Sequence, residues 1–147
     1  MPTTTTPTRD EARIRACIAA VAQAIRVKDV NALMTHYTPD TIIFDLMPLQ
    51  TLGIDAYRRN FEAWFGSVEG PIEFELRDLR IAARDDVAFG HYTSGIRCRR
   101  KTGAQTDYRV RVSVGLRKVG DDWLIVHEHV SLPFPSMEAM QAALGSA

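Results

Sequence analysis

The strongest constraint on the fold is a change of hydrophobic period about halfway along the 147-residue chain. Before Pro71, apolar residues recur at the three- and four-residue spacing of amphipathic helices, as in Ile14, Ile18 and Val21. After Pro71 they alternate with polar residues, which is typical of half-buried strands. Helices followed by a run of strands predict an α+β domain, with the helices on one face of an antiparallel sheet.

Three helices are expected before Pro71. The first runs to about Val27, and the second starts from Asp29 as N-cap and ends before Pro39, with Tyr37 on its apolar face. The third follows Gly53 and is ended by Gly70-Pro71. Its apolar positions are Ile54, Tyr57, Phe61, Trp64, Phe65 and Val68. A short strand over residues 41–45 separates the second and third helices.

The second half predicts a sheet of long strands. The first alternating segment begins at Ile72, and its phase slips near Arg77 and Asp78, which indicates a β-bulge. Three further strands, over about residues 86–100, 106–119 and 122–133, form an antiparallel meander. A last helix follows its N-cap Ser136. A long bulged sheet curls around its helices and leaves a cavity at the open end, where small ligands bind.

Size and composition limit the domain count and the class of partner. We expect one domain over residues 9–147, after a disordered Thr- and Pro-rich tail at residues 1–8. Lys plus Arg and Asp plus Glu both number 18, so net charge favours neither nucleic acid nor a membrane surface. Two distant cysteines, no signal peptide and no membrane-spanning stretch predict a cytoplasmic protein.

Alternation in the last strand predicts an acidic residue inside the cavity. Glu128 lies in phase with Leu124, Val126 and Val130, which hydrophobicity assigns to the inward row. A carboxylate there has a raised pKa suited to proton transfer, or it has an ion-pair partner or reaches solvent at an edge position, and these interpretations stay open. By the same phase argument His91 either contacts Glu128 in the cavity or is an ordinary core histidine.

The opposite row of the last strand is predicted to face outward. His127 and His129 share that face and could ligate a metal, but no third ligand follows at a fixed spacing, so no metal is predicted. A mixed polar and aromatic outer face is typical of a homodimer interface, although a solvated face is the alternative. The predicted interface consists of Arg111, Trp123, His127 and His129.

Asp45 is a candidate general base. It ends the short first strand beside Phe44 and Leu46, at the expected mouth of the cavity. Apolar surroundings would raise its pKa, whereas the alternative is an aspartate that caps a turn. Apolar cavity walls are predicted from Tyr37, Tyr57, Phe61, Trp64, Phe89 and Val114.

Two stretches resemble SnoaL-like and ketosteroid isomerase-like proteins of the nuclear transport factor 2-like superfamily. One runs from Lys28-Asp29 through Asp45 to Tyr57, and the other is the ending from Trp123 to Ser131. The ending also resembles the association domain of calcium/calmodulin-dependent protein kinase. The resemblance spans about residues 10–135 and implies a cone-shaped, cystatin-like fold with three N-terminal helices on a curved antiparallel sheet.

The resemblance also implies a reaction class. Asp45 matches the catalytic aspartate of the isomerase, which moves a proton between carbons of an enolisable ketone. Val21 or a neighbour, and Val114, stand where the isomerase has oxyanion-hole donors, which argues against steroid isomerisation itself. We expect cofactor-free proton transfer on a small carbonyl or polyketide-like compound, with Asp45 as base and Glu128, with or without His91, as second acid or base. The alternative is a non-catalytic, homodimeric binding or assembly module.

Overall fold

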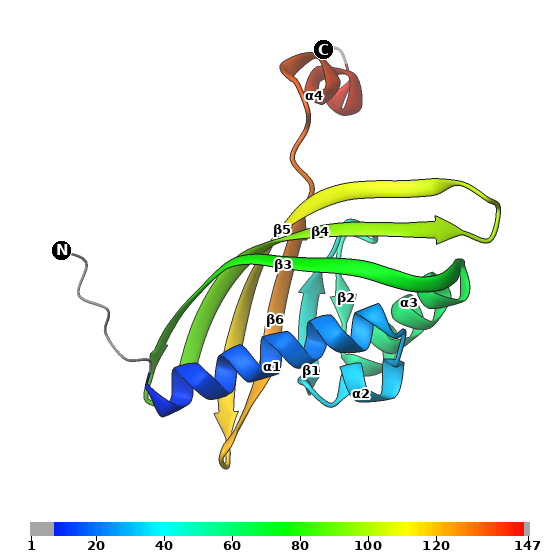
Figure 1. The fold of residues 1–147 in the computed structure, drawn as a ribbon. Helices are drawn as coiled ribbons and strands as arrows, with labels where there is room; N and C mark the ends of the chain where they lie inside the picture. Colours follow the sequence, from blue (N-terminus) through cyan, green and yellow to red (C-terminus); the bar gives the residue numbers. More distant parts are fainter. Residues whose placement is uncertain (1–7, 146–147) are drawn as a thin grey trace.

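The computed structural model describes residues 8–145, in which helices cover the concave face of a strongly curved sheet (Figure 1). The helices are α1 (Arg9–Arg26), α2 (Val30–Met34), α3 (Ile54–Gly66) and α4 (Met137–Leu144). The strands are β1 (Tyr37–Phe44), β2 (Thr51–Leu52), β3 (Val68–Arg84), β4 (Val87–Arg100), β5 (Gln105–Val119) and β6 (Asp122–Ser131). The α+β class predicted from the change of hydrophobic period is confirmed.

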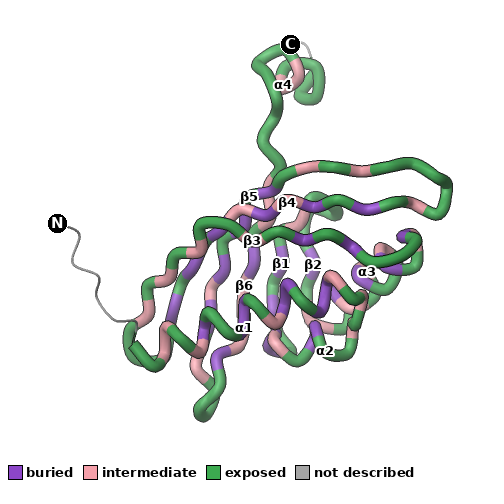
Figure 2. Tube along the Cα trace, viewed as in Figure 1, coloured by how far each residue is buried: buried purple, intermediate pink, exposed green. Residues whose placement is uncertain are grey.

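The six strands form one sheet in the order β2-β1-β6-β5-β4-β3. Strands β3 to β6 pair as the predicted antiparallel meander, whereas β1 adds to β6 in parallel. Helix α1 packs on β3 and β6, and α2 and α3 lie beyond its C-terminal end (Figure 1). Buried and exposed residues alternate along these strands (Figure 2), and the buried ones belong to one hydrophobic cluster with the buried helix residues. The core therefore lies between the helical layer and the sheet.

Helix α1 begins with a capping box. The Thr8 hydroxyl accepts from the Glu11 backbone N–H, and the Glu11 carboxylate accepts from the Thr8 N–H. Thr8 therefore belongs to the start of the domain and not to the predicted tail, whose other residues, 1–7, lie outside the described residues. The α1 residues Ile14, Ile18 and Val21 are buried, as their spacing predicts.

The predicted bulge in β3 is present. The ladder with β4 shifts between Arg77 and Arg80, and Asp78 has a positive φ of 57°. Leu76 on one side of the shift and Leu79 on the other are both partly buried against the core. The extra residue keeps apolar side chains on the inner face while the strand bends.

Two predicted element boundaries near prolines are wrong. Helix α2 ends at Met34, and Tyr37 opens β1 instead of lying on the helix. Pro39 fits inside β1 because the β1–β6 ladder is interrupted between Tyr37 and Ile42, so its missing N–H removes no ladder bond. Likewise α3 ends at Gly66, and Pro71 lies inside β3 where the ladder is again interrupted, between Glu69 and Glu73.

The predicted inward row of β6 is wrong in its first half. Trp123 and Ile125 are buried, whereas Leu124 and Val126 are only partly buried. The β5–β6 ladder passes from Leu116↔Ile125 to Gly115↔His127, so Val126 is an extra residue opposite no partner. This bulge changes the phase of the strand, and Glu128 is inward as predicted, with 5% of its surface exposed.

The predicted phase of β4 is wrong by one residue. Ala88, Gly90 and Tyr92 face inward, whereas Phe89 and His91 are exposed. The pairing with β5 explains this, because Tyr92 lies opposite the buried Val112 and side chains directly opposite share one face of a sheet. His91 therefore cannot contact Glu128 in the cavity.

The C-terminal helix α4 follows its predicted N-cap Ser136, whose hydroxyl accepts from the Ala139 N–H. It has no buried residue and stands apart from the sheet (Figure 1).

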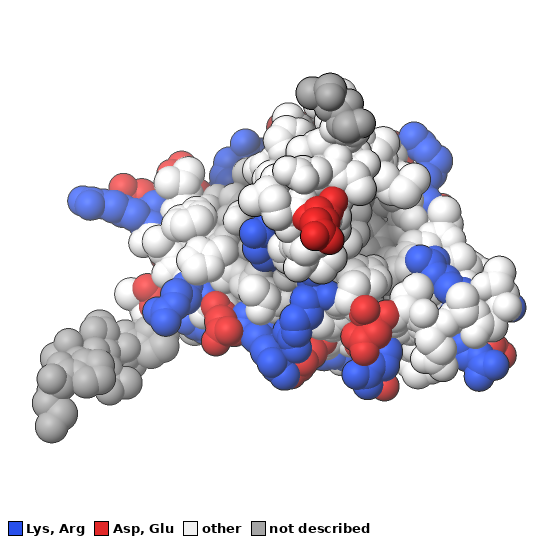
Figure 3. All heavy atoms as spheres, turned by 90° about the horizontal axis from the view of Figure 1, so that it is seen from above, with Lys and Arg blue, Asp and Glu red and all other residues white. Residues whose placement is uncertain are grey.

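Seen from above, acidic and basic side chains lie beside one another around the rim, and neither sign covers a continuous area of this face (Figure 3). Among the helices of residues 8–145, none combines the length and apolar character needed to cross a bilayer.

Candidate active site

A cavity of about 510 Å³ lies between the inner face of the sheet, the end of α1 and helix α3. This volume is within the range usual for small-molecule sites. Its wall is largely aromatic and aliphatic. The lining includes Ile25, Tyr37, Asp45, Met47, Tyr57, Asn60, Phe61, Trp64, Ser67, Phe74, Tyr92, Ile96, Arg100, Tyr108, Val110, Val112, Glu128 and Val130.

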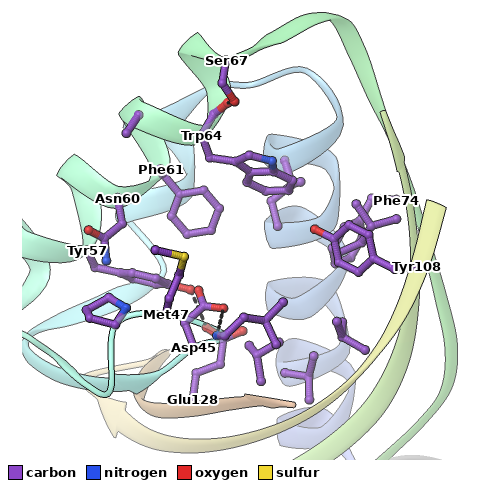
Figure 4. A pocket seen from close by; sticks show the side chains of 18 of the residues that line it. Asp45, Met47, Tyr57, Asn60, Phe61, Trp64, Ser67, Phe74, Tyr108 and Glu128 are labelled. Atoms are coloured by element: carbon purple, nitrogen blue, oxygen red, sulfur yellow. Dashed lines mark hydrogen bonds between the residues drawn. The ribbon is translucent and has the colours of Figure 1, made fainter. Parts of the chain in front are cut away.

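Glu128 lies at one end of this cavity, near Tyr57 (Figure 4), and two tyrosine hydroxyls donate to it. The Tyr37 hydroxyl donates to Glu128 Oε2 at 2.7 Å, and the Tyr57 hydroxyl donates to the same oxygen at 3.2 Å. Both tyrosines are buried, and their rings meet edge to face with centroids 5.2 Å apart. Among residues 8–145 nothing donates to Oε1, so this second carboxyl oxygen stays available to a ligand.

Burial raises the pKa of Glu128 to about 7. The negative charge of Asp45 also raises this pKa, whereas the hydrogen bonds from Tyr37 and Tyr57 lower it because they favour the carboxylate. The desolvation effect is the largest of these. Glu128 is therefore a carboxyl group that holds its proton up to about neutral pH, as a general acid must.

Asp45 is the second carboxyl group at this end of the cavity (Figure 4). It follows the last residue of β1, which places it where the chain leaves the sheet for the loop over the cavity mouth. Desolvation raises its pKa, and the Leu46 backbone N–H, which donates to Oδ1 at 2.7 Å, lowers it. Asp45 is thus a partly desolvated carboxylate that accepts a hydrogen bond from the next residue, and its role as a base stays a prediction.

Helix α3 supplies one aromatic wall. Tyr57, Phe61 and Trp64 recur at helical spacing, with ring centroids 4.9 Å apart for the first pair and 5.9 Å for the second. Phe74 and Tyr108 face them from the sheet across the cavity (Figure 4). The space between these walls suits a flat, ring-sized apolar molecule.

The structure brings together most of the predicted site residues. Asp45, Glu128 and the predicted wall residues Tyr37, Tyr57, Phe61 and Trp64 all line the cavity, while their chemical roles stay predictions. His91 and Phe89 are on the outer face, with ring centroids 5.9 Å apart, so their predicted positions are wrong. Val114 is buried in the core and is not among the lining residues.

Sequence reasoning missed Tyr92, Tyr108, Asn60 and Arg100, which also line the cavity. The two strand tyrosines could have been found by pairing β4 and β5 correctly, because Tyr92 lies opposite Val112. Asn60 lies one residue before Phe61 on α3 and donates to the Thr51 hydroxyl at 2.9 Å. No local pattern distinguishes Arg100 from the arginines that precede it in Arg97-Cys98-Arg99-Arg100.

The outer face of β6 differs from the predicted interface at one residue. Trp123 is buried under α1, where its indole N–H donates to Asp10 Oδ1 at 3.1 Å, so it cannot belong to an outer surface. Nδ1 of His127 is 2.7 Å from the carbonyl oxygen of Ile42. Phe44 meets the rings of His127 and His129 edge to face.

Over residues 8–145, His, Cys, Asp and Glu nowhere gather in a group of three that could hold a metal.

Comparison with known proteins agrees with this architecture. Residues 14–135 match the SnoaL-like domain family. A nuclear transport factor 2-like protein of unknown function from Pseudomonas putida KT2440 is 32% identical, with 92% of this chain and 94% of that chain covered and a TM-score of 0.78. The chain therefore belongs to the SnoaL-like family, within the nuclear transport factor 2-like superfamily. A comparison with curated proteins found no match.

More distant structures share the fold. A ketosteroid isomerase-like protein from Erwinia carotovora atroseptica SCRI1043 is 21% identical, covers 88% of this chain and 100% of its own, and has a TM-score of 0.76. A proposed dehydratase of the nuclear transport factor 2-like family from Streptomyces avermitilis is 18% identical, with 86% and 99% covered and a TM-score of 0.76. At these identities the likeness establishes the curved-sheet fold and leaves the reaction open.

Proposed function

We propose that this protein is a cofactor-free enzyme that moves a proton on a small, largely apolar carbonyl compound. The observation that carries the proposal is the arrangement at Glu128, a buried carboxyl group whose Oε2 accepts from two tyrosine hydroxyls while Oε1 is left for a ligand. A second carboxyl group, Asp45, shares the same end of the cavity. Two carboxyl groups in one apolar site supply an acid and a base.

The environments of the two carboxyl groups assign their roles. Glu128 is almost completely buried, and its pKa is raised to about 7, whereas Asp45 is partly exposed: desolvation raises its pKa as well, but the Leu46 N–H that donates to it partly opposes that rise. Asp45 therefore loses its proton first and serves as the base. Glu128 keeps its proton and serves as the acid.

The reaction follows from this division. Asp45 takes a proton from the carbon next to the substrate carbonyl. The C–H electron pair forms the C=C bond of an enolate, and negative charge moves to the carbonyl oxygen. Because Tyr37 and Tyr57 both donate to Oε2, the proton of Glu128 resides on Oε1, which donates to the carbonyl oxygen as negative charge develops there. Return of the proton from Asp45 to another carbon completes an isomerisation. Transfer of that proton from Asp45 to a β-hydroxyl, whose C–O bond breaks as the enolate electrons form the C=C bond, releases water and completes a dehydration.

Glu128 thereby provides the hydrogen-bond donor that the sequence lacks at Val21 and Val114. Both valines are buried in the core. The donor in this chain instead comes from β6. After the bulge at Val126, the side chain of Glu128 lies on the cavity side of the strand. In this proposal Glu128 stabilises the negative charge that develops on the carbonyl oxygen, in place of donors at Val21 and Val114.

The test is hydrogen–deuterium exchange at the carbon next to the carbonyl of 2-tetralone, followed by NMR in D₂O near neutral pD. The wild-type protein is expected to accelerate exchange over buffer, Asp45→Asn to abolish that acceleration, and Glu128→Gln to reduce it by about 10²-fold or more. Glu138→Gln is the matched control because Glu138 is exposed on α4. Exchange that is equal in wild type and Asp45→Asn would overturn the proposal.

The alternative function is a non-catalytic binding module that uses the same cavity. Binding of 2-tetralone to the wild-type protein, measured by calorimetry, with no acceleration of exchange would favour it. This outcome differs from a misfolded sample, because ligand binding itself reports an intact cavity.

A further inference from the structure

Arg100 places a positive charge inside the apolar cavity. It ends β4, and it continues the inward row of Ile96 and Cys98, because alternate residues of a strand share a face. Arg97 and Arg99, on the outward row, are exposed. Arg100 is half-buried and lines the cavity.

Arg100 also differs from its neighbours in its partners. Arg97 forms ion pairs with Glu73 and Asp107, and Arg99 forms one with Glu69. Within residues 8–145, no carboxylate lies within ion-pair distance of Arg100. The contact made by its guanidinium is a hydrogen bond of 2.6 Å from Nη1 to the Ser67 hydroxyl. An arginine has five N–H donors, so most of its donors are free for a ligand.

Ser67 fixes the guanidinium at the end of the cavity opposite the two carboxyl groups. Ser67 follows the last residue of α3, and its hydroxyl donates to the Trp64 carbonyl at 2.7 Å. Figure 4 shows Ser67 at one end and Asp45 and Glu128 at the other, with Phe61 and Trp64 along the wall between them. The cavity is therefore positive at one end, apolar in the middle and acidic at the other end.

We propose that Arg100 is a binding residue for a carboxylate of the substrate, and that the substrate is an amphipathic keto or hydroxy acid. Its carboxylate would pair with the guanidinium, its ring-sized body would lie between the α3 aromatics and Tyr108, and its reacting carbon would reach Asp45 and Glu128. A partly desolvated arginine without an acidic partner favours a planar, bidentate carboxylate. The position of the reacting carbon rests on the proposed function above, whereas the carboxylate site does not.

Two probes of the same shape test the carboxylate site. We choose 2-naphthoate and the uncharged 2-naphthamide, with affinities measured by isothermal titration calorimetry. The wild-type protein is expected to prefer 2-naphthoate, and Arg100→Gln to reduce that preference about tenfold or more, since hydrogen bonds to charged groups are worth that much. Arg99→Gln is the control, because the adjacent side chain faces outward, and it should leave the preference unchanged.

Several results would overturn the proposal. These are equal affinity of the wild type for both probes, no binding of either probe, or an Arg100→Gln protein that binds both probes more weakly by the same factor. The last result would mean that Arg100 only supports the end of α3. Because the preference is a ratio measured on one protein, partial loss of stability in Arg100→Gln changes both affinities and does not imitate the expected result.

The two proposals fail separately. Lost exchange of 2-tetralone with a retained preference for 2-naphthoate would overturn the reaction and keep the carboxylate site. Retained exchange without any preference would overturn the carboxylate site and keep the reaction.

Discussion

At the scale of single residues, Glu128 is a buried carboxyl group whose ionised form is costly. Its position inside an apolar cavity destabilises the ionised carboxylate, and two tyrosine hydroxyls offset only part of that effect. A group that opposes folding once it is ionised is characteristic of sites kept for function, because stability alone would favour an uncharged residue.

This cost has a predictable pH dependence. The pKa of Glu128 is raised from 4.5 to about 7 on folding, so the native state holds its proton more tightly than the unfolded state. The stabilisation from this proton is complete below about pH 4.5 and is lost as pH rises through about 7. Between about pH 4.5 and pH 8 this group should lower the free energy of unfolding of the wild type by about 3 kcal/mol. Glu128→Gln lacks the group, so its free energy of unfolding should not show this fall. Urea unfolding at both pH values measures it, and the exposed Glu138→Gln should follow wild type.

The tyrosine hydroxyls should tune the same pKa. Tyr37→Phe removes the shorter hydrogen bond to Oε2 and should raise the pKa of Glu128 further, because that bond favours the carboxylate. Tyr57→Phe should raise it less, since its bond is 3.2 Å long. Carbon-13 NMR titration of the carboxyl group reads the pKa directly. Tyr92→Phe is the control, because Tyr92 is equally buried and donates no hydrogen bond to Glu128 within residues 8–145; a shift as large as that of Tyr37→Phe would contradict the assignment.

At the scale of elements, hydrophobic periodicity identified the helices, the strands of the meander and the β3 bulge, but it did not fix which row of each strand faces inward. In β4, large apolar residues such as Phe89 lie on the outer face, while the inner row includes Ala88 and Gly90. Gly90 is tightly enclosed, since an added Cβ would lie 3.1 Å from the Arg80 carbonyl oxygen. Only the pairing of neighbouring strands resolves the phase, and that pairing is a long-range property.

The same limit applies to the candidate site. Asp45 and Glu128 carry their own local signal, because each is a carboxyl group among apolar neighbours in sequence. Arg100 carries none, because its distinction from Arg99 arises only from the face of β4 on which it lies. Trp123 was misplaced because the extra residue of the β6 bulge, Val126, is indistinguishable in sequence from an ordinary strand residue.

The buried position of Trp123 leads to a prediction about how β6 joins α1. Its indole N–H donates to Asp10 in the first turn of α1, and Lys118 also pairs with Asp10 at 3.1 Å. Trp123→Phe removes the indole donor and leaves a small void, so it should destabilise the fold by about 1–3 kcal/mol in denaturant unfolding. Trp64→Phe, on the partly exposed cavity wall, should cost less stability and weaken 2-naphthamide binding instead. Equal stability losses would contradict this division.

At the scale of the whole molecule, the domain core and the C-terminal helix α4 contribute differently to stability. The sheet with α1, α2 and α3 contains the core, whereas α4 contributes no buried residue and its Met137 and Leu144 are 64% and 72% exposed. The predicted homodimer stays a prediction, now without Trp123 in its interface. Light scattering on the full chain tests it.

Removing α4 should leave the folded domain intact. A chain ending at Leu132 is expected to keep the melting temperature of the full chain within a few degrees, because deletion exposes no core surface. Thermal unfolding followed by circular dichroism measures this. A large fall in melting temperature that depends on protein concentration would instead show that α4 packs on another copy of the chain.

The Val126 bulge divides β6 into two lengths that can vary independently. Residues before it, such as Trp123, are constrained by the core, whereas residues after it, such as Glu128, are presented to whatever occupies the cavity. Substitutions beyond the bulge can therefore change the chemistry of the site without altering how the strand joins α1. A family built on this strand could exchange one reaction for another while inheriting the same scaffold.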